Sequence, residues 1–324
     1  MTKKILIYNS GGGLGDSIQL FPLILSIKNH FRSVELYYLG AHKNHFLDKL
    51  KNYNINIINL DLKIKYFGFR WRHFFEVKKN FTHLNLYKFD LILDLQSKLR
   101  NTIILKRIPS KSFYSSTFNF AFCSVKKNYL HNSNISIKVI SNLEKILNTK
   151  IKLIDFDLSN LNNLFIEEAK KLLPDKNYIG LSMTQGNKYR KKSWSINNFI
   201  KLAHEIKKNN KKPVFFIEKD NVEIVNKIKS NIDNALFPEH NSTLASPALV
   251  TALSARLEKA ISIDNGIMHM ISLSNVPMIV LFGPTNSEKF APDKKNVIIL
   301  DSNKMYQSDD IQKIQVEDVL GHLS

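Results

Sequence analysis

Short apolar runs alternate with helix-like stretches along most of the chain, and this alternation constrains the fold more than any other feature. The runs are "KILIYN", "VELYYLG", "INIINL" and "FDLILDL" in the first half, and "NYIGLSM", "PVFFIE", "ALFPE", "KAISIDN" and "PMIVLFG" in the second. Buried strands that are joined through helices form parallel sheets with both faces covered. The sequence therefore predicts an α/β protein with one such domain in each half.

Helix-like segments lie between these runs. In the first half they are "SIQLFPLILSIKNHF", "HKNHFLDKLKN", "KLRNTIILKRI" and "ISIKVISNLEKILN"; in the second half they cover residues 195–208, 221–230, 246–257 and 267–274. Apolar residues at helical spacing predict that each segment packs one face on a sheet. The passage 110–165 is less regular than the rest.

A chain of 324 residues is long enough for two domains that each bury a core. The boundary is expected near residue 165, where the irregular passage ends. This division gives an N-terminal domain over residues 1–165 and a C-terminal domain over residues 166–305. The last helix, within residues 306–324, can return to the N-terminal domain.

Charge and cysteine content narrow the class of protein. Lysine and arginine outnumber the acids 47 to 28, a net charge of +19, which favours an anionic partner such as nucleic acid, a phosphorylated substrate or an acidic membrane surface. Cys123 is the single cysteine, so an intrachain disulfide and a zinc site built from cysteines are excluded. No apolar run approaches the roughly 20 residues of a membrane span, and we expect a cytoplasmic protein.

The glycine-rich stretch "NSGGGLGDSIQLFP", residues 9–22, follows the first apolar run. A dinucleotide fingerprint would need its third glycine where Asp16 or Ile18 stands, and no Gly-Lys-Ser/Thr closes a P-loop. A carboxylate at a helix start would also repel phosphates. The turn therefore presents Asp16 to another molecule, with Gly13 and Gly15 allowing close approach. The alternative is that Asp16 only caps a helix beginning at Ser17.

A second group of polar residues occurs in "ISIDNGIMHMISLSNVPMIVLFGPT", residues 261–285. One strand is expected to end at Asp264, and a short helix to follow Asn265 and carry His269. Ligands of open α/β sheets bind outside the carboxyl ends of the strands, and the amides of residues 266–268 would suit a phosphate.

Together these motifs resemble glycosyltransferase family 9, the heptosyltransferases of lipopolysaccharide core assembly. The matching motifs are Gly15-Asp16 to Pro22, Asp264-Asn265-Gly266 to His269, and Pro277 to Thr285, with lesser matches in "FDLILDLQ", "KKSWS" and "IQVEDVL". The resemblance implies two Rossmann-like domains facing across a cleft, the GT-B fold. It also implies inverting, metal-independent transfer of a sugar, heptose, from a nucleoside-diphosphate sugar, ADP-heptose, to a lipopolysaccharide-core or related glycan acceptor.

The resemblance assigns roles to individual residues. Asp16 would take the proton of the acceptor hydroxyl, and Lys192, or its neighbour Lys191, would face the leaving diphosphate. The donor-binding residues implied are Thr184, Gln185, Glu218, Asp264, Asn265, Gly266 and His269. The residues implied for the acceptor substrate are Gly13, Gly15, Arg70, Arg72, Gln96 and Arg100. Ser195 stands where the family has proline, and Asn265 where it has Ser or Thr.

Plainer roles stay open for several of these residues. Lys192 fits a solvated basic loop, Asp264 a turn, His269 a packed histidine, and Glu218 a strand end at the surface.

Other functions stay open as well. A nucleic-acid or anionic-surface binder would use "KIKYFGFRWRHFF", residues 63–75, in which basic and aromatic residues alternate. In a glycosyltransferase the same stretch, with Arg70, Trp71 and Arg72, can grip a phosphorylated lipid acceptor at the inner membrane surface, and no nucleic acid is expected as a partner. A GT-B enzyme of other chemistry, such as a nucleotide-sugar epimerase, is the third possibility.

Overall fold

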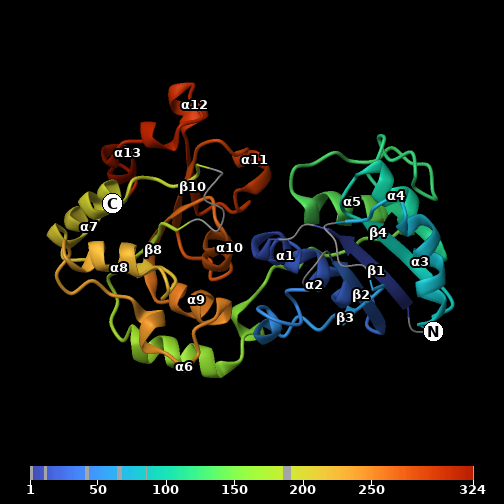
Figure 1. Ribbon diagram of the computed structural model, residues 1–324, viewed down its shortest axis with the longest axis horizontal. Coiled ribbons are helices and arrows are strands. Elements are labelled where there is room, and N and C mark those ends of the chain that lie inside the picture. Colours follow the sequence, from blue (N-terminus) through green and yellow to red (C-terminus); the bar gives the residue numbers. More distant parts are fainter. Residues whose placement is uncertain are drawn as a thin grey trace. The chain divides into compact units, whose positions relative to one another are not determined.

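The computed structural model describes residues 3–10, 13–40, 44–63, 68–84, 86–184 and 191–323. The chain divides into two compact units, Met1–Phe156 and Asp157–Ser324. In Figure 1 the first unit runs from blue to green and the second from yellow-green to red. Each unit contains one parallel sheet of five strands, so the predicted α/β class is confirmed.

The sheet of the first unit has the strand order β3-β2-β1-β4-β5. Its strands are β1 (Lys3–Asn9), β2 (Val34–Gly40), β3 (Ile58–Asn59), β4 (Phe89–Asp94) and β5 (Ser110–Ser115). Consecutive residues of β1, such as Ile5, Leu6 and Ile7, are all buried, which requires that both faces of the sheet are covered. Asp94 pairs with Tyr8 on one side and with Ser115 on the other, so three strands end at the same edge.

The helices of the first unit are α1 (Leu14–Ile18), α2 (Phe21–His30), α3 (His73–Thr82), α4 (Leu99–Leu105) and α5 (Ile135–Leu147). The expected helix start at Ser17 is wrong, because α1 already begins at Leu14. Pro22 explains why α1 and α2 are separate: it lacks an N–H and clashes with the preceding turn, so it is tolerated only at the start of a new helix.

The segment "HKNHFLDKLKN" was expected to be a helix, but it forms no α-helix in its described part, residues 44–52. The Asn44 side chain accepts a hydrogen bond from the Phe46 amide at 3.0 Å, and the Leu50 amide donates to the His45 carbonyl. Such side-chain contacts compete with helical hydrogen bonds. A turn results, followed by the short helix η1 (Lys51–Tyr53).

The sheet of the second unit has the order β10-β9-β8-β6-β7. Its strands are β6 (Tyr178–Ser182), β7 (Lys212–Phe216), β8 (Leu257–Ile263), β9 (Met278–Phe282) and β10 (Val297–Asp301). The predicted strand "ALFPE" is wrong, because only Leu236 pairs, in a single bridge with Val214. Pro238 then starts the 3-10 helix η4 (Pro238–Asn241).

Helices cover this second sheet as predicted for 195–208, 221–230, 246–257 and 267–274, with shifts of a few residues at most. The helices of the unit are α6 (Asn163–Leu172), α7 (Ile196–Lys208), α8 (Val222–Lys229), α9 (Pro247–Ser254), α10 (Gly266–Ser272), α11 (Ser287–Phe290), α12 (Ser302–Tyr306) and α13 (Val316–Leu320). The described residues of this unit also form the short 3-10 helices η2 (Leu158–Asn160) and η5 (Ile311–Lys313), besides η4.

The division between the units falls after Phe156, earlier than the boundary expected near 165. The reason is that α6 packs against α9 and so belongs to the second unit. The last helix, α13, also belongs to this unit rather than to the first. It packs against α7, and Ile314, Val316 and Val319 are part of the core beneath it.

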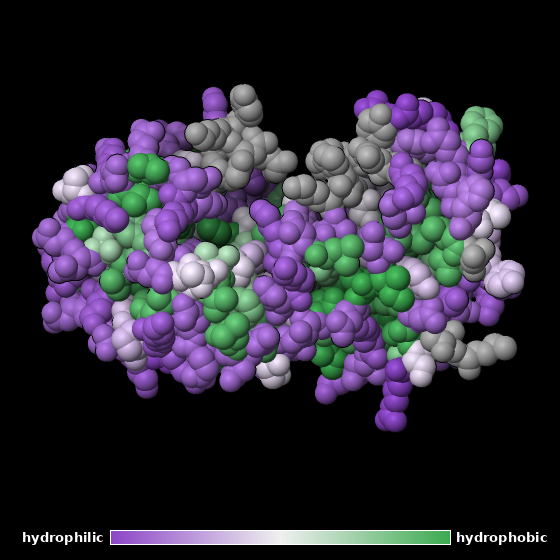
Figure 2. All heavy atoms as spheres, turned by 60° about the horizontal axis from the view of Figure 1, so that its bottom comes forward, coloured by the Kyte–Doolittle hydropathy of each residue, from purple (hydrophilic) through white to green (hydrophobic). Residues whose placement is uncertain are grey.

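The surface of both units is mainly polar on the face shown in Figure 2, with smaller apolar patches between the polar residues. This distribution is ordinary for a folded protein, in which apolar atoms still form about half of the surface. The apolar side chains that define the fold are those of the two cores.

Gly283, which directly follows β9, offers a test of the packing of the C-terminal segment. A Cβ added there would lie 2.8 Å from Ile311 Cβ and 3.0 Å from the Asp309 carbonyl oxygen. We expect Gly283→Ala to lower the free energy of unfolding by about 1–3 kcal/mol, measured by denaturant titration. Gly266→Ala is the control, since its Cβ would meet nothing within 4 Å; equal effects of the two changes would contradict this packing.

Candidate active site

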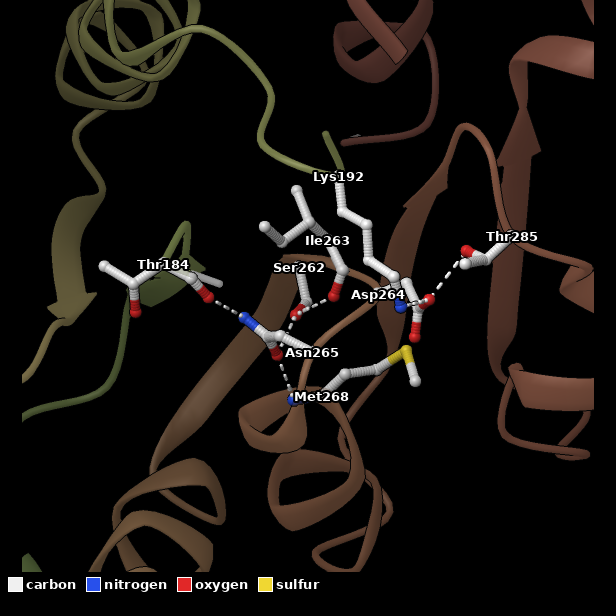
Figure 3. A network of polar contacts seen from close by, with 8 residues as sticks. All are labelled: Thr184, Lys192, Ser262, Ile263, Asp264, Asn265, Met268 and Thr285. Atoms are coloured by element: carbon white, nitrogen blue, oxygen red, sulfur yellow. Dashed lines mark hydrogen bonds and ion pairs between the residues drawn. The ribbon is translucent and has the colours of Figure 1, made fainter. Parts of the chain in front are cut away.

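The carboxyl ends of β6, β8 and β9 lie side by side, because Ser182 pairs with Ser262 and Ile263 with Leu281. Polar residues follow each of these ends. They are Thr184 after β6, Asp264 and Asn265 after β8, and Thr285 after β9. Figure 3 shows two groups of contacts at this edge of the sheet: Asn265 meets the backbone carbonyl of Thr184, and Asp264 meets Thr285. The carboxyl edge is where open α/β sheets bind ligands.

Lys192 and Asp264 form an ion pair whose side chains are only 12% and 8% exposed. The same oxygen of Asp264, Oδ2, accepts a hydrogen bond from Thr285 Oγ1 at 2.6 Å. The alternative of a solvated loop is therefore wrong for Lys192. Lys191 by contrast is exposed and has a left-handed backbone, φ 48°. Of the two lysines, the structure places Lys192 at the strand ends (Figure 3).

Asn265 ties two strand ends and a helix together. Its Nδ2 donates to Ser182 Oγ and to the Thr184 carbonyl, both at 2.8 Å, and its Oδ1 accepts from the Met268 amide at 2.8 Å. A serine or threonine hydroxyl could not reach all three partners, so the asparagine fits this position. The expectation that the amide of Met268 serves a phosphate is corrected, because Asn265 already occupies it as the N-cap of α10.

Thr184 links the end of β6 to the end of β7. It is 7% exposed, and its Oγ1 donates to Glu218 Oε2 at 2.8 Å. Glu218 itself is exposed. Gly266 is half-buried at the first position of α10, and His269 is buried within that helix. Gln185 lies outside the described residues.

The loop that carries Lys192 is held by the C-terminal segment. Gln312 donates from Nε2 to the Ser193 carbonyl at 2.6 Å and accepts the Ser195 amide on Oε1 at 3.0 Å. Trp194 is buried, and its Nε1 donates to the Ile314 carbonyl at 2.8 Å. Gln312 is thus a positioning residue that the sequence analysis missed, because nothing near it in the sequence marks this contact.

Ser195 starts α7 as expected for a residue in the place of proline. Its Oγ accepts a hydrogen bond from the Asn197 amide at 3.2 Å. A side-chain cap of this kind satisfies one of the unpaired amides of a helix start. The helix therefore begins just after the Lys192 loop without the proline.

Asp16, in the first unit, is half-buried in the third position of α1. Its Oδ2 accepts a hydrogen bond from the Gly13 amide at 3.2 Å. The alternative role as the cap of a helix that begins at Ser17 is therefore wrong, because Asp16 lies inside α1 and contacts the residue that precedes this helix. This contact does not exclude a second role, since a carboxylate has two oxygens and about four acceptor sites. Gly13 is exposed and Gly15 is buried.

Gln96 joins the end of β4 to the end of β1 just before the glycine-rich turn. Its Nε2 donates to Asn9 Oδ1 at 2.6 Å, and its Oε1 accepts from Ser10 Oγ at 2.9 Å. The Gln96 amide in turn donates to Asp94 Oδ1 at 3.0 Å. Gln96 therefore has a structural part in holding the turn, and its contact with an acceptor substrate stays a prediction.

Asp94, the anchor of this network, is completely buried. Burial raises the pKa of its carboxyl, while hydrogen bonds from Thr102, at 2.5 Å, and Ser115, at 2.8 Å, favour the charged form. These hydroxyls come from α4 and β5. The network thus joins β4, α4 and β5 at the carboxyl edge of the first sheet.

Arg70, Arg72 and Arg100 are exposed and share one neighbour, His73. His73 is buried, and its Nδ1 accepts the Arg70 amide at 2.9 Å. Burial lowers the pKa of His73, and the three arginine charges lower it further against the opposing charge of Glu76. Because the lowered pKa favours the neutral form of His73, this residue does not add a fourth positive charge to those of the three arginines. Sequence reasoning named the arginines but not this histidine.

The described part of the chain holds no cluster of three or more His, Cys, Asp or Glu side chains that could bind a metal ion. Within the same residues, no helix has the length and apolar character needed to cross a membrane.

Comparison with known proteins gives one consistent result. The model of glycosyltransferase family 9 (heptosyltransferase) matches residues 77–320. The chain belongs to this family. It is 22% identical over 287 residues to lipooligosaccharide heptosyltransferase 2 of Campylobacter jejuni, covering 86% of this chain and 81% of that protein.

Solved structures agree on the fold. A family 9 glycosyltransferase from Veillonella parvula has a TM-score of 0.71 at 18% identity, covering 98% of this chain and 95% of that one. The E. coli heptosyltransferase WaaC with ADP has a TM-score of 0.68 at 12% identity, covering 99% and 96%. The family 9 chain thus has the GT-B fold, and its general activity is glycosyl transfer in lipopolysaccharide biosynthesis.

The Lys192–Asp264 pair offers a test of the site's stability. Removing one partner of a buried ion pair leaves an uncompensated charge, so Asp264→Asn and Lys192→Met should each cost about 3 kcal/mol of unfolding free energy. The double variant should cost less than the sum of the two, measured as a double-mutant cycle by denaturant titration. Additive losses would contradict the pairing. The Lys170–Glu167 pair, with both side chains more than half exposed, is the control and should show no measurable coupling.

Proposed function

We propose that this family 9 enzyme transfers heptose from ADP-heptose to a lipopolysaccharide-core or related glycan acceptor, with inversion and without a metal ion. The observation that carries the proposal is Lys192, 12% exposed and paired with Asp264 at the carboxyl ends of the parallel strands, where Thr285 donates a hydrogen bond to the same aspartate oxygen. A cation fixed there is suited to a diphosphate, whose negative charge grows as it leaves the sugar. Asp16, from the glycine-rich turn, is the proposed base.

These two residues account for both the proton that the acceptor loses and the charge that the leaving group gains. The hydroxyl of the acceptor substrate loses its proton to the Asp16 carboxylate as its oxygen attacks the anomeric carbon of the donor. The bond between that carbon and the diphosphate oxygen breaks on the opposite face, so the configuration inverts. Lys192 stabilises the departing nucleoside diphosphate, and Asp16 later returns its proton to water.

The donor contacts proposed for the second unit follow from the chemistry of a nucleotide sugar. Glu218 would accept hydrogen bonds from ribose hydroxyls, and its link to Thr184 fixes its direction. Asn265 and Gly266 would shape the diphosphate site, with His269 supporting α10. Gln185 would complete this set. ADP is proposed as the nucleotide because the similar E. coli structure contains it.

The acceptor contacts proposed for the first unit follow from charge. Arg70, Arg72 and Arg100 provide three cations around His73, which suit the phosphates of a lipid-linked glycan. Trp71 and Phe75 are 57% and 78% exposed beside them. Aromatic and basic side chains together favour contact with an anionic membrane surface, which supports our proposal that the enzyme works at the cytoplasmic face of the inner membrane.

The function is tested with variants of the two proposed reacting residues. Asp16→Asn should lower the transfer rate by about a hundredfold or more and leave ADP affinity unchanged, because only proton removal is lost. Lys192→Met should lower the transfer rate by about 10²–10³-fold and weaken ADP binding as well. Transfer from ADP-heptose and thermal protection by ADP, UDP, GDP and CMP are the measurements.

Lys191→Met is the matched control and should change transfer little. Full transfer by the Asp16 variant would overturn the catalytic assignment. Protection by none of the nucleotides, together with tight binding of oligonucleotides, would overturn the function itself.

The arginine cluster is tested separately. Arg70→Ala, Arg72→Ala and Arg100→Ala should each raise the KM for a phosphorylated acceptor several-fold, with unchanged ADP affinity and little effect on a dephosphorylated acceptor. Arg32→Ala, at an exposed position of the same unit, is the control. Equal KM values for the wild type and all three variants would remove the acceptor assignment.

A further inference from the structure

A second carboxyl group lies close to Glu218 and has no part in the function described above. Glu218 follows the end of β7, and Glu239 lies in η4, the turn that replaces the predicted strand "ALFPE". His240, the residue after Glu239, lies with its Nε2 2.9 Å from the carbonyl oxygen of Ile217, the residue before Glu218, so the two glutamates are neighbours in space. Glu218 itself accepts the Thr184 hydroxyl at the carboxyl edge of the sheet.

The turn that carries Glu239 is firmly attached to this edge. The Phe215 amide donates to the Leu236 carbonyl at 2.9 Å, and His240 Nε2 lies 2.9 Å from the Ile217 carbonyl oxygen. The Phe237 ring stacks on Phe215 and on His240, with ring centres 5.5 and 5.2 Å apart. These contacts on both sides of Glu239 fix its backbone beside the residue that precedes Glu218.

The two carboxyl groups differ in charge at neutral pH. Burial, and after it the negative charge of Glu218, together raise the pKa of Glu239 to about 8. Glu239 is therefore mostly protonated at pH 7 and can donate a hydrogen bond. Glu218 accepts one from Thr184. The pair thus presents a donor next to an acceptor.

Three other titratable groups near η4 have contacts of their own, and two more, which follow Glu218, are exposed. His240 faces the Ile217 carbonyl, and Glu168 of α6 accepts the Ser242 hydroxyl at 2.6 Å. Lys229 of α8 lies over the Phe237 ring, 5.6 Å from its centre. Lys219 and Asp220 follow Glu218 and are exposed. Glu218 is accordingly the charged group that acts on Glu239.

We propose that Glu239 is a specificity residue of the nucleoside site, whose carboxylic acid donates a hydrogen bond to the donor nucleotide beside the ribose hydroxyls bound by Glu218. This inference rests on the proposed function, which places the nucleoside at Glu218. A nucleoside offers hydroxyl groups and ring acceptors, so it matches a site that holds one proton donor and one acceptor. An ionised Glu239 would lose the donor and add negative charge near an anionic ligand.

Nucleotide affinity should fall as the pH rises. The protonated form binds, so nucleotide affinity is full below pH 7 and falls as the pH rises through about 8. If only the protonated form binds, the Kd for ADP should rise about tenfold between pH 7 and pH 9, because about a tenth of the carboxyl groups keep their proton at pH 9.

The experiment is calorimetric titration of the full chain with ADP between pH 7 and pH 9. Glu239→Gln keeps a hydrogen-bond donor but cannot ionise, so its Kd should match that of the wild type at pH 7 and stay nearly constant. Glu239→Ala should bind several-fold more weakly at pH 7 and also lose the pH dependence. Glu223→Gln, at an exposed position of α8, is the matched control and should follow the wild type.

A second measurement needs no variant. At pH 8 the wild type should take up a fraction of a proton on binding ADP, measured as a binding enthalpy that depends on the ionisation enthalpy of the buffer. No proton uptake, or the same pH slope in the wild type and Glu239→Gln, would overturn the role of Glu239 while ADP binding itself stands. No binding of ADP, UDP, GDP or CMP at any pH would instead overturn the proposed function.

Discussion

The ion pair between Lys192 and Asp264 is the interaction on which the rest of the second unit's site depends. Removing a charged side chain from water until it is only 12% exposed costs folding free energy, unless an opposite charge lies beside it. Asp264 supplies that charge before any substrate binds, and Thr285 holds the carboxylate in place. The aspartate and the threonine thus have a structural reason for their spacing: each follows the end of a strand of the sheet, and the threonine hydroxyl donates to the aspartate carboxylate.

In both units, polar side chains provide hydrogen-bond partners for the loops at the carboxyl edge of the sheet. Loops at the carboxyl ends of parallel strands lack the repeating hydrogen bonds of the strands, so their polar groups need other partners. Asn265 provides these partners in the second unit, and Asp94 with Gln96 provides them in the first. Polar groups held in this way are fixed before a ligand arrives, which is the condition for strong electrostatic stabilisation of a reaction.

The net charge of +19 acquires a more specific meaning in the structure. Part of it gathers as Arg70, Arg72 and Arg100 around a histidine that burial keeps neutral. Lys192 adds nothing to this excess, because Asp264 neutralises it. The second unit also contains the carboxyl groups of Glu218 and Glu239, which suit the hydroxyl groups of a nucleoside better than its phosphates. Charge is therefore divided according to the group that each region is proposed to bind.

The sequence by itself determined the α/β class, the order of most elements and the family, because strand and helix periodicity and the strand-end motifs are local signals. It also named Asp16, Lys192, Asp264 and Asn265. Only the tertiary structure decided what these residues contact. Lys192 meets Asp264 across 72 positions, and Gln312 reaches Ser193 across 119. The same holds for the single bridge in place of the strand "ALFPE" and for the attachment of the last helix to the second unit. Such contacts depend on packing between distant segments, for which no short stretch of sequence carries a signal.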